Sequence, residues 1–227
     1  MAPSAARDGA REALGAPALA MAATFIAFGA AVAEAGLSLG WSLVATGAVY
    51  GMAGQLVLLQ ATSLGAPAFV AMISATAANA RFLPMSVAIA PLLGARTGWR
   101  RLLVVPFIAI TPWAAGMGVL PGLPDSARLP WFLGFSAASW AVAMATTAAG
   151  HLAAPLLPVE WRAALLFTNP LYFALLMAGD LGRRGVAPAI LGGVVAAPLA
   201  WWVGGAWGLP VAGVVGGTLA FLAMRAR

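Results

Sequence analysis

The 227-residue sequence contains no cysteine and no lysine, a single histidine and only six acidic residues. Without cysteine, the chain can have no disulfide, no iron–sulfur centre and no thiol catalysis. One histidine and six acids offer few metal ligands, so we expect neither a metal site nor a cofactor. Charged residues make up 8% of the chain, whereas soluble domains carry about 25%. The composition therefore excludes a soluble enzyme, a disordered protein and a nucleic-acid-binding domain.

The positive charge has a different explanation from nucleic-acid binding. All 12 basic residues are arginine, and the net charge is +6. Such a balance would ordinarily suggest a nucleic-acid partner, but most of these arginines lie in short gaps between apolar runs. Arginines in such gaps are typical topology signals of membrane proteins. We expect the chain to lie in a lipid bilayer and to bind no nucleic acid.

The apolar runs predict the fold class. Hydrophobic residues make up 63% of the chain, and their runs have the length that a helix needs to cross about 30 Å of hydrocarbon. We predict an all-α polytopic membrane protein with about seven or eight transmembrane helices. Residues 1–16 would form a short polar N-terminal tail, and residues 17–227 a single transmembrane domain. The runs are roughly 17–36, 40–62, 67–93, 101–120, 130–157, 163–181, 187–204 and 208–224.

Several prolines lie inside these runs. A proline in a helix frees backbone carbonyls, which in lipid must be satisfied by protein or by a water-lined cavity. Each proline could simply kink its helix, but several together favour the broken helices of transporters, which bind substrate at mid-depth. We predict at least one break, at Pro84 or Pro170. The prolines concerned are Pro84, Pro91, Pro106, Pro112, Pro170 and Pro198.

Four polar residues at membrane depth are candidate substrate-binding residues. A buried arginine such as Arg81 costs about 2.5–3.5 kcal/mol, so it faces protein or water. It could donate hydrogen bonds to the free carbonyls of a broken helix, or it could bind a carboxylate. Gln55 follows Gly51 and Gly54, two small residues that allow another backbone to approach. Asn79 and Asn169 lie three segments apart, Asn169 beside Pro170, a pattern compatible with an inverted repeat.

Two titratable residues are candidates for proton coupling. Glu34 lies near the end of the first run and His151 in the fifth, and each can carry a proton when its surroundings tune it. A lone histidine can also be an ordinary packing residue. The sequence has no His-Glu-x-x-His and no Gly-x-Ser-x-Gly motif, so we do not expect an enzyme.

The order of these motifs resembles the AzlC family of branched-chain amino acid permeases. The matching motifs are Ala48–Gln55, Gly65-Ala66-Pro67, Asn79-Ala80-Arg81 and Ala90-Pro91. The chain departs from the family at Phe82, where histidine is frequent, and near Ile110-Thr111-Pro112-Trp113, where an Asp-Glu pair is common. It would therefore be a divergent member.

The resemblance implies function as well as fold. It implies a multi-pass permease of the bacterial cytoplasmic (inner) membrane that exports branched-chain or other apolar amino acids. It also implies a small, separate membrane partner of the AzlD type. The alternative is a membrane subunit or scaffold that does not itself transport and needs a partner for any activity.

Overall fold

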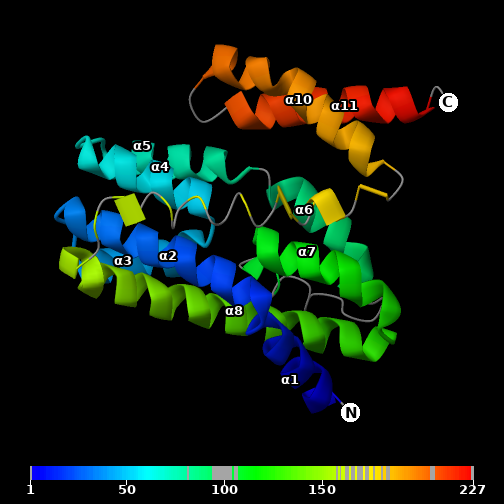
Figure 1. The fold of residues 1–227 in the computed structure, drawn as a ribbon, viewed down its shortest axis with the longest axis horizontal. Coiled ribbons are helices and arrows are strands. Elements are labelled where there is room, and N and C mark those ends of the chain that lie inside the picture. Colours follow the sequence, from blue (N-terminus) through cyan, green and yellow to red (C-terminus); the bar gives the residue numbers. More distant parts are fainter. Residues whose placement is uncertain are drawn as a thin grey trace.

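The architecture is a set of packed helices (Figure 1). In the computed structural model, every regular element among the described residues is helical, which confirms the all-α prediction. The structure describes the chain except residues 1, 81, 94–103, 105–106, 157, 159, 162–163, 165–166, 168–170, 172–173, 176, 180, 183–184, 205–207 and 226–227. The helices are α1 (Ala2–Ala13), α2 (Ala16–Glu34), α3 (Leu39–Val49), α4 (Met52–Ser63), α5 (Ala68–Ala78), α6 (Phe82–Ile89), η1 (Ala90–Leu93), α7 (Ile110–Val119), η3 (Leu120–Gly122), α8 (Asp125–Ala153), η4 (Ala154–Leu156), α10 (Val186–Val203) and α11 (Gly208–Arg225).

The number of membrane-spanning helices is lower than the sequence predicts. Within the described residues, 3 helices are long and apolar enough to cross a membrane, or up to 4 if the bent pair α5–α6 is one span. The prediction of seven or eight is therefore wrong for this part of the chain. One reason is that two runs expected to be single helices are divided, and another is that the runs 101–120 and 163–181 lie partly or mostly outside the described residues. The run 40–62 is split into α3 and α4, and the run 67–93 into α5 and α6.

The second division confirms a broken helix but shifts its position. α5 ends at Ala78, α6 begins at Phe82, and the two are bent by 50° relative to each other. The break therefore precedes Pro84, which lies in the first turn of α6. A first-turn N–H has no intrahelical partner, so proline is tolerated there. Pro170, the other predicted breakpoint, lies outside the described residues, as does Asn169 of the suggested inverted repeat.

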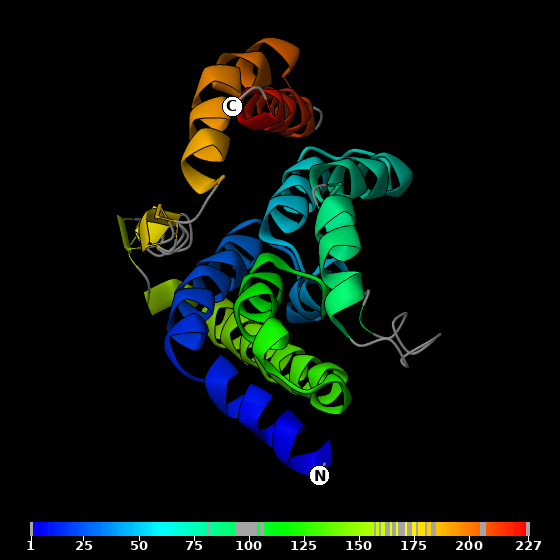
Figure 2. The same ribbon diagram turned by 90° about the vertical axis from the view of Figure 1, so that its right-hand side faces the viewer.

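The long helix α8 is the scaffold on which α1, α2 and α3 pack (Figures 1 and 2). Its 29 residues would span about 44 Å at about 1.5 Å per residue, more than the hydrocarbon core requires. Glycines allow the helices to approach closely. A side chain at Gly29 would collide with the backbone oxygen of Thr147, and one at Gly150 with that of Ile26.

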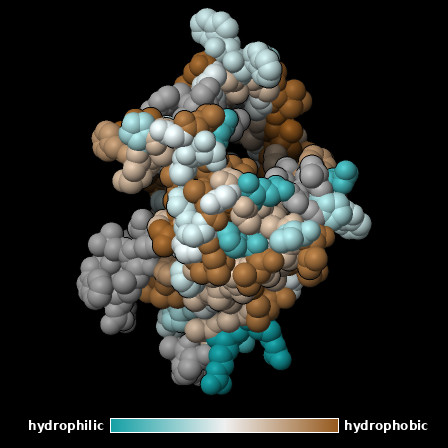
Figure 3. All heavy atoms as spheres, turned by 90° about the vertical axis from the view of Figure 1, so that its left-hand side faces the viewer, coloured by the Kyte–Doolittle hydropathy of each residue, from teal (hydrophilic) through white to brown (hydrophobic). Residues whose placement is uncertain are grey.

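Residues 2–13, described from the sequence as a polar tail, form the helix α1. Its small residues Ala5, Gly9 and Ala13 are buried, and its charged residues are exposed. In the face shown in Figure 3, apolar and weakly polar atoms cover most of the surface, while hydrophilic side chains project at the end where α1 lies.

The helices α10 and α11 form a pair that packs mainly on itself. Gly192 and Gly216 face each other so closely that a side chain on either would meet the other's backbone. The pair lies at the upper edge of Figures 1 and 2. Large apolar side chains such as Trp201 and Trp202 are almost fully exposed, at 91% and 84%. Such a surface suits contact with lipid.

Candidate functional site

The first helix break, between α3 and α4, is made by two consecutive residues. Tyr50 adopts a left-handed conformation with φ 33°, which is unusual for a bulky residue. Gly51 is extended and is the N-cap residue that precedes α4. A break of this kind leaves the last carbonyls of α3 and the first N–H groups of α4 without intrahelical partners. At membrane depth such groups must find partners within the protein.

Asn79 supplies partners to both sides of this break. Its side-chain oxygen accepts a hydrogen bond from the Gly54 N–H in the first turn of α4, at 3.1 Å. Its side-chain nitrogen donates to the carbonyl oxygen of Val49, the last residue of α3, at 3.3 Å. One amide thus bridges the two helix ends.

Two glycines make room for this amide. A side-chain carbon at Gly51 would lie 2.7 Å from Asn79 Oδ1, and one at Gly54 would lie 2.7 Å from Asn79 Cγ. The small-residue pair expected from the sequence therefore admits a neighbouring side chain as well as a backbone.

Asn79 also lies at the second break, where α5 ends. Its own N–H is bonded within α5 to the oxygens of Ala75 and Thr76, and its carbonyl oxygen accepts from the Phe82 N–H at 2.9 Å. The two breaks are thus joined through a single residue. They lie next to each other because α4 and α5 form an antiparallel hairpin.

Gln55 lies in α4, and its side chain contacts α3 and lines neither of the hollows described below. Its side chain is 0% exposed, and its nitrogen donates to the carbonyl oxygen of Ala45 at 3.4 Å. Its side-chain oxygen has no partner among the described residues. An amide with one unpaired buried oxygen is costly, so this group is able to accept a further hydrogen bond.

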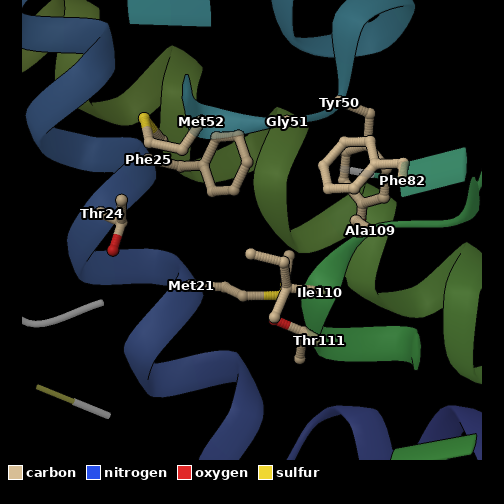
Figure 4. A pocket seen from close by; sticks show the side chains of 10 residues that line it. All are labelled: Met21, Thr24, Phe25, Tyr50, Gly51, Met52, Phe82, Ala109, Ile110 and Thr111. Carbon is tan, nitrogen blue, oxygen red and sulfur yellow. The ribbon is translucent and has the colours of Figure 1, made fainter. Parts of the chain in front are cut away.

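Two hollows flank the breaks. The larger, which we call the groove, has a volume of about 730 Å³ and is lined by residues of α3 to α6, by residues of the breaks, including Asn79, and by Ile108. The smaller, which we call the inner cavity, has a volume of about 40 Å³ (Figure 4). It is lined by Met21, Thr24, Phe25, Tyr50, Gly51, Met52, Phe82, Ala109, Ile110 and Thr111. No charged side chain is among the described residues that line either hollow.

The sequence match now decides the family. The sequence model described as AzlC protein matches residues 17–157, more than half of the chain. The chain belongs to the AzlC family. The matched region runs from α2 to the end of α8 and includes both helix breaks and every residue that lines the two hollows. The chain is thus a multi-pass membrane protein of a transporter-related family. No curated protein and no solved structure matches it significantly.

The structure does not bring all four predicted substrate-binding residues of this AzlC protein together. Asn79 lines the groove, whereas Gln55 lines neither hollow. Arg81, two residues after Asn79, and Asn169 lie outside the described residues.

Glu34 and His151 end or nearly end two neighbouring helices, α2 and α8, away from the hollows. Glu34 has an interaction partner. His151 is partly buried, and its Nδ1 has no hydrogen-bond partner among the described residues. Their role in proton coupling remains a prediction, now located at the C-terminal ends of these two helices.

Sequence reasoning did not assign a role to Tyr50 or Phe82, which line both hollows. The available signal was weak. Tyr50 precedes a glycine in the middle of an apolar run, and Phe82 was noted only as a departure from the family pattern.

Proposed function

We propose that this AzlC-family protein exports branched-chain or other small apolar amino acids across a bacterial cytoplasmic membrane. The observation that supports the proposal is the groove beside two joined helix breaks. Broken helices in transporters present free N–H and carbonyl groups to substrates at mid-depth. The volume of about 730 Å³ is within the range of about 300–1,000 Å³ that is usual for small-molecule sites.

The chemistry of an amino acid suits this arrangement. Its carboxylate needs donors, which the first turn of α4 and the guanidinium of Arg81 would supply. An arginine fork binds a carboxylate through two parallel hydrogen bonds. Its ammonium needs acceptors, and the carbonyls at the end of α3 and the oxygens of Asn79 and Asn169 are the proposed ones. Gln55 was a candidate from the sequence, but it lines neither hollow and is left out of this set. The apolar groove lining suits an aliphatic side chain.

Two further parts of the proposal concern coupling and assembly. Glu34 and His151 are the candidate proton carriers, since a carboxylate and an imidazole can each bind and release a proton. A small membrane protein of the AzlD type is the proposed partner. We therefore propose testing export both with and without such a protein.

Export by the Arg81→Lys variant tests the proposal. Efflux of labelled isoleucine or valine would be measured from cells, normalised to folded protein in the membrane. We expect Arg81→Lys to lose most of the efflux, because an ammonium cannot reproduce the arginine fork. Arg81→Ala should be at least as defective.

The matched control is Arg11→Lys, which changes an exposed arginine on α1 and should leave efflux unchanged. Near-normal efflux from Arg81→Lys would remove the carboxylate role. Loss of folded protein in both Arg81 variants would instead support a structural role, in which the arginine hydrogen-bonds the free carbonyls of the broken helix. Absence of efflux from the unmodified protein, with and without the partner, would favour the alternative of a non-transporting membrane subunit.

A further inference from the structure

Two aromatic residues lie between the groove and the inner cavity. Tyr50 and Phe82 are the only described residues that line both hollows. They come from different helix breaks, Tyr50 from the end of α3 and Phe82 from the start of α6. Figure 4 shows them together among the side chains that surround the inner cavity. The two rings therefore form a wall that the groove and the inner cavity share.

The local structure holds each ring in place. The left-handed backbone of Tyr50 (φ 33°) turns the chain at the break, and its ring stacks on Phe25 with centroids 6.4 Å apart. The Phe82 ring lies against the bare backbone of Gly51, where a side-chain carbon would be only 2.6 Å from Phe82 Cε2. Tyr50 is 3% exposed, and its hydroxyl has no hydrogen-bond partner among the described residues.

We infer that Tyr50 and Phe82 form a constriction that determines which molecules pass between the groove and the inner cavity. The inference deepens the proposed transport function and relies on it for the identity of the substrate. The constriction concerns only the two hollows and the rings that they share, so it can be tested without any substrate.

The lining of the inner cavity indicates which groups can pass. It contains three hydroxyl-bearing residues, Thr24, Tyr50 and Thr111, and otherwise apolar side chains and backbone. The Thr24 hydroxyl is already bonded to the Ala20 carbonyl oxygen at 2.9 Å. An ion would enter without a charged partner, at a large cost. The inner cavity therefore suits a small aliphatic group, such as the side chain of an apolar amino acid whose charged end stays in the groove.

Site-directed thiol labelling tests the constriction directly, because the natural chain has no cysteine. A single cysteine at Thr111 reports on the inner cavity, and one at Thr76 reports on the groove. The purified full-length protein in nanodiscs, open to solvent on both sides, would be labelled with methyl methanethiosulfonate and with a bulky fluorescein maleimide. We expect the maleimide to label Thr76→Cys at least tenfold faster than Thr111→Cys, and the small reagent to reduce this difference.

Opening the constriction should then expose the inner cavity. We expect Phe82→Ala to raise maleimide labelling of Thr111→Cys at least tenfold. The matched control is Leu83→Ala, which removes the adjacent side chain that lines the groove but not the inner cavity; it should have little effect. Phe82→Leu serves as a milder variant if Phe82→Ala does not fold, and should give a smaller increase.

Three results would overturn the inference. They are equal labelling of Thr76→Cys and Thr111→Cys in the unmodified background, no change on shortening Phe82 in folded protein, and an equal increase with Leu83→Ala. Repeating the experiment with leucine present separates the two proposals. If leucine slows the labelling of Thr111→Cys, both proposals are supported. If leucine has no effect on labelling while the Phe82 variants still increase it, the constriction stands and the proposed substrate is contradicted.

Discussion

A single side chain, that of Asn79, couples two helix breaks. Its oxygen accepts from the first turn of α4 and its nitrogen donates to the end of α3, while its backbone ends α5. Each bond satisfies a group that has no intrahelical partner. An asparagine in this position therefore has a structural role even before any substrate is considered.

Replacing Asn79 should reduce stability. Asn79→Ala leaves the Gly54 N–H and the Val49 carbonyl without their side-chain partner, and each unsatisfied group costs about 1–3 kcal/mol. We expect the midpoint of thermal unfolding in detergent to fall clearly.

A suitable control is Thr76→Ala, since Thr76 is exposed and its hydroxyl bonds only within its own helix, to Met72. Its effect should stay within about 0.5 kcal/mol. A midpoint for Asn79→Ala equal to that of Thr76→Ala would show that the bridging bonds contribute nothing.

At the scale of helices, the breaks depend on close approach at glycines. Gly54 lies inside α4, and a side-chain carbon there would lie 2.9 Å from the Ala75 oxygen and would overlap the Asn79 amide. Gly118 lies inside α7 with nothing within 4 Å of such a carbon. The two positions make a matched pair for one substitution.

The pair predicts opposite outcomes. Gly54→Ala should destabilise the protein by about 1–3 kcal/mol through overpacking. Gly118→Ala should be neutral or stabilising by up to about 1 kcal/mol, because alanine is the better helix former. Folded yield and thermal unfolding in detergent would measure both. Equal tolerance at the two positions would contradict the close contact between α4 and Asn79.

The sequence predicts this helical arrangement only in part. Apolar runs and internal prolines correctly indicated membrane helices and a broken segment. The location of the break was missed, because Pro84 fits the first turn of α6 and the chain breaks earlier, at Asn79. The break at Tyr50 was missed because a left-handed tyrosine and a hydrogen bond from Asn79, thirty residues away, leave no periodic signal in the local sequence. These two missed divisions account for part of the overestimated number of spans. The rest comes from runs in which the described helices are short, as in α7 with 10 residues, or which lie largely outside the described residues, as in 163–181.

At the scale of the whole molecule, different helices support the fold and form the breaks. The long helix α8 supports α1, α2 and α3, and the α4–α5 hairpin brings the two breaks together. The buried contact between the Thr46 and Thr147 hydroxyls, 3.0 Å apart, ties the helix that ends at the first break to this scaffold. The family match covers α8 and both breaks but not α10 and α11, so the groove and the breaks of the proposed transport site lie within residues 17–157, and Asn169 is the one proposed site residue beyond them.

Counterflow in vesicles tests the central claim most directly. Purified protein would be reconstituted, with its partner where one is required, into vesicles loaded with unlabelled leucine. Uptake of labelled leucine, valine, glutamate and arginine would then be compared with that of protein-free vesicles. The described lining of the groove and inner cavity has no charged side chain, so we predict uptake of leucine and valine well above background and little uptake of glutamate or arginine. Equal uptake of all four, or uptake of the charged amino acids alone, would contradict the account.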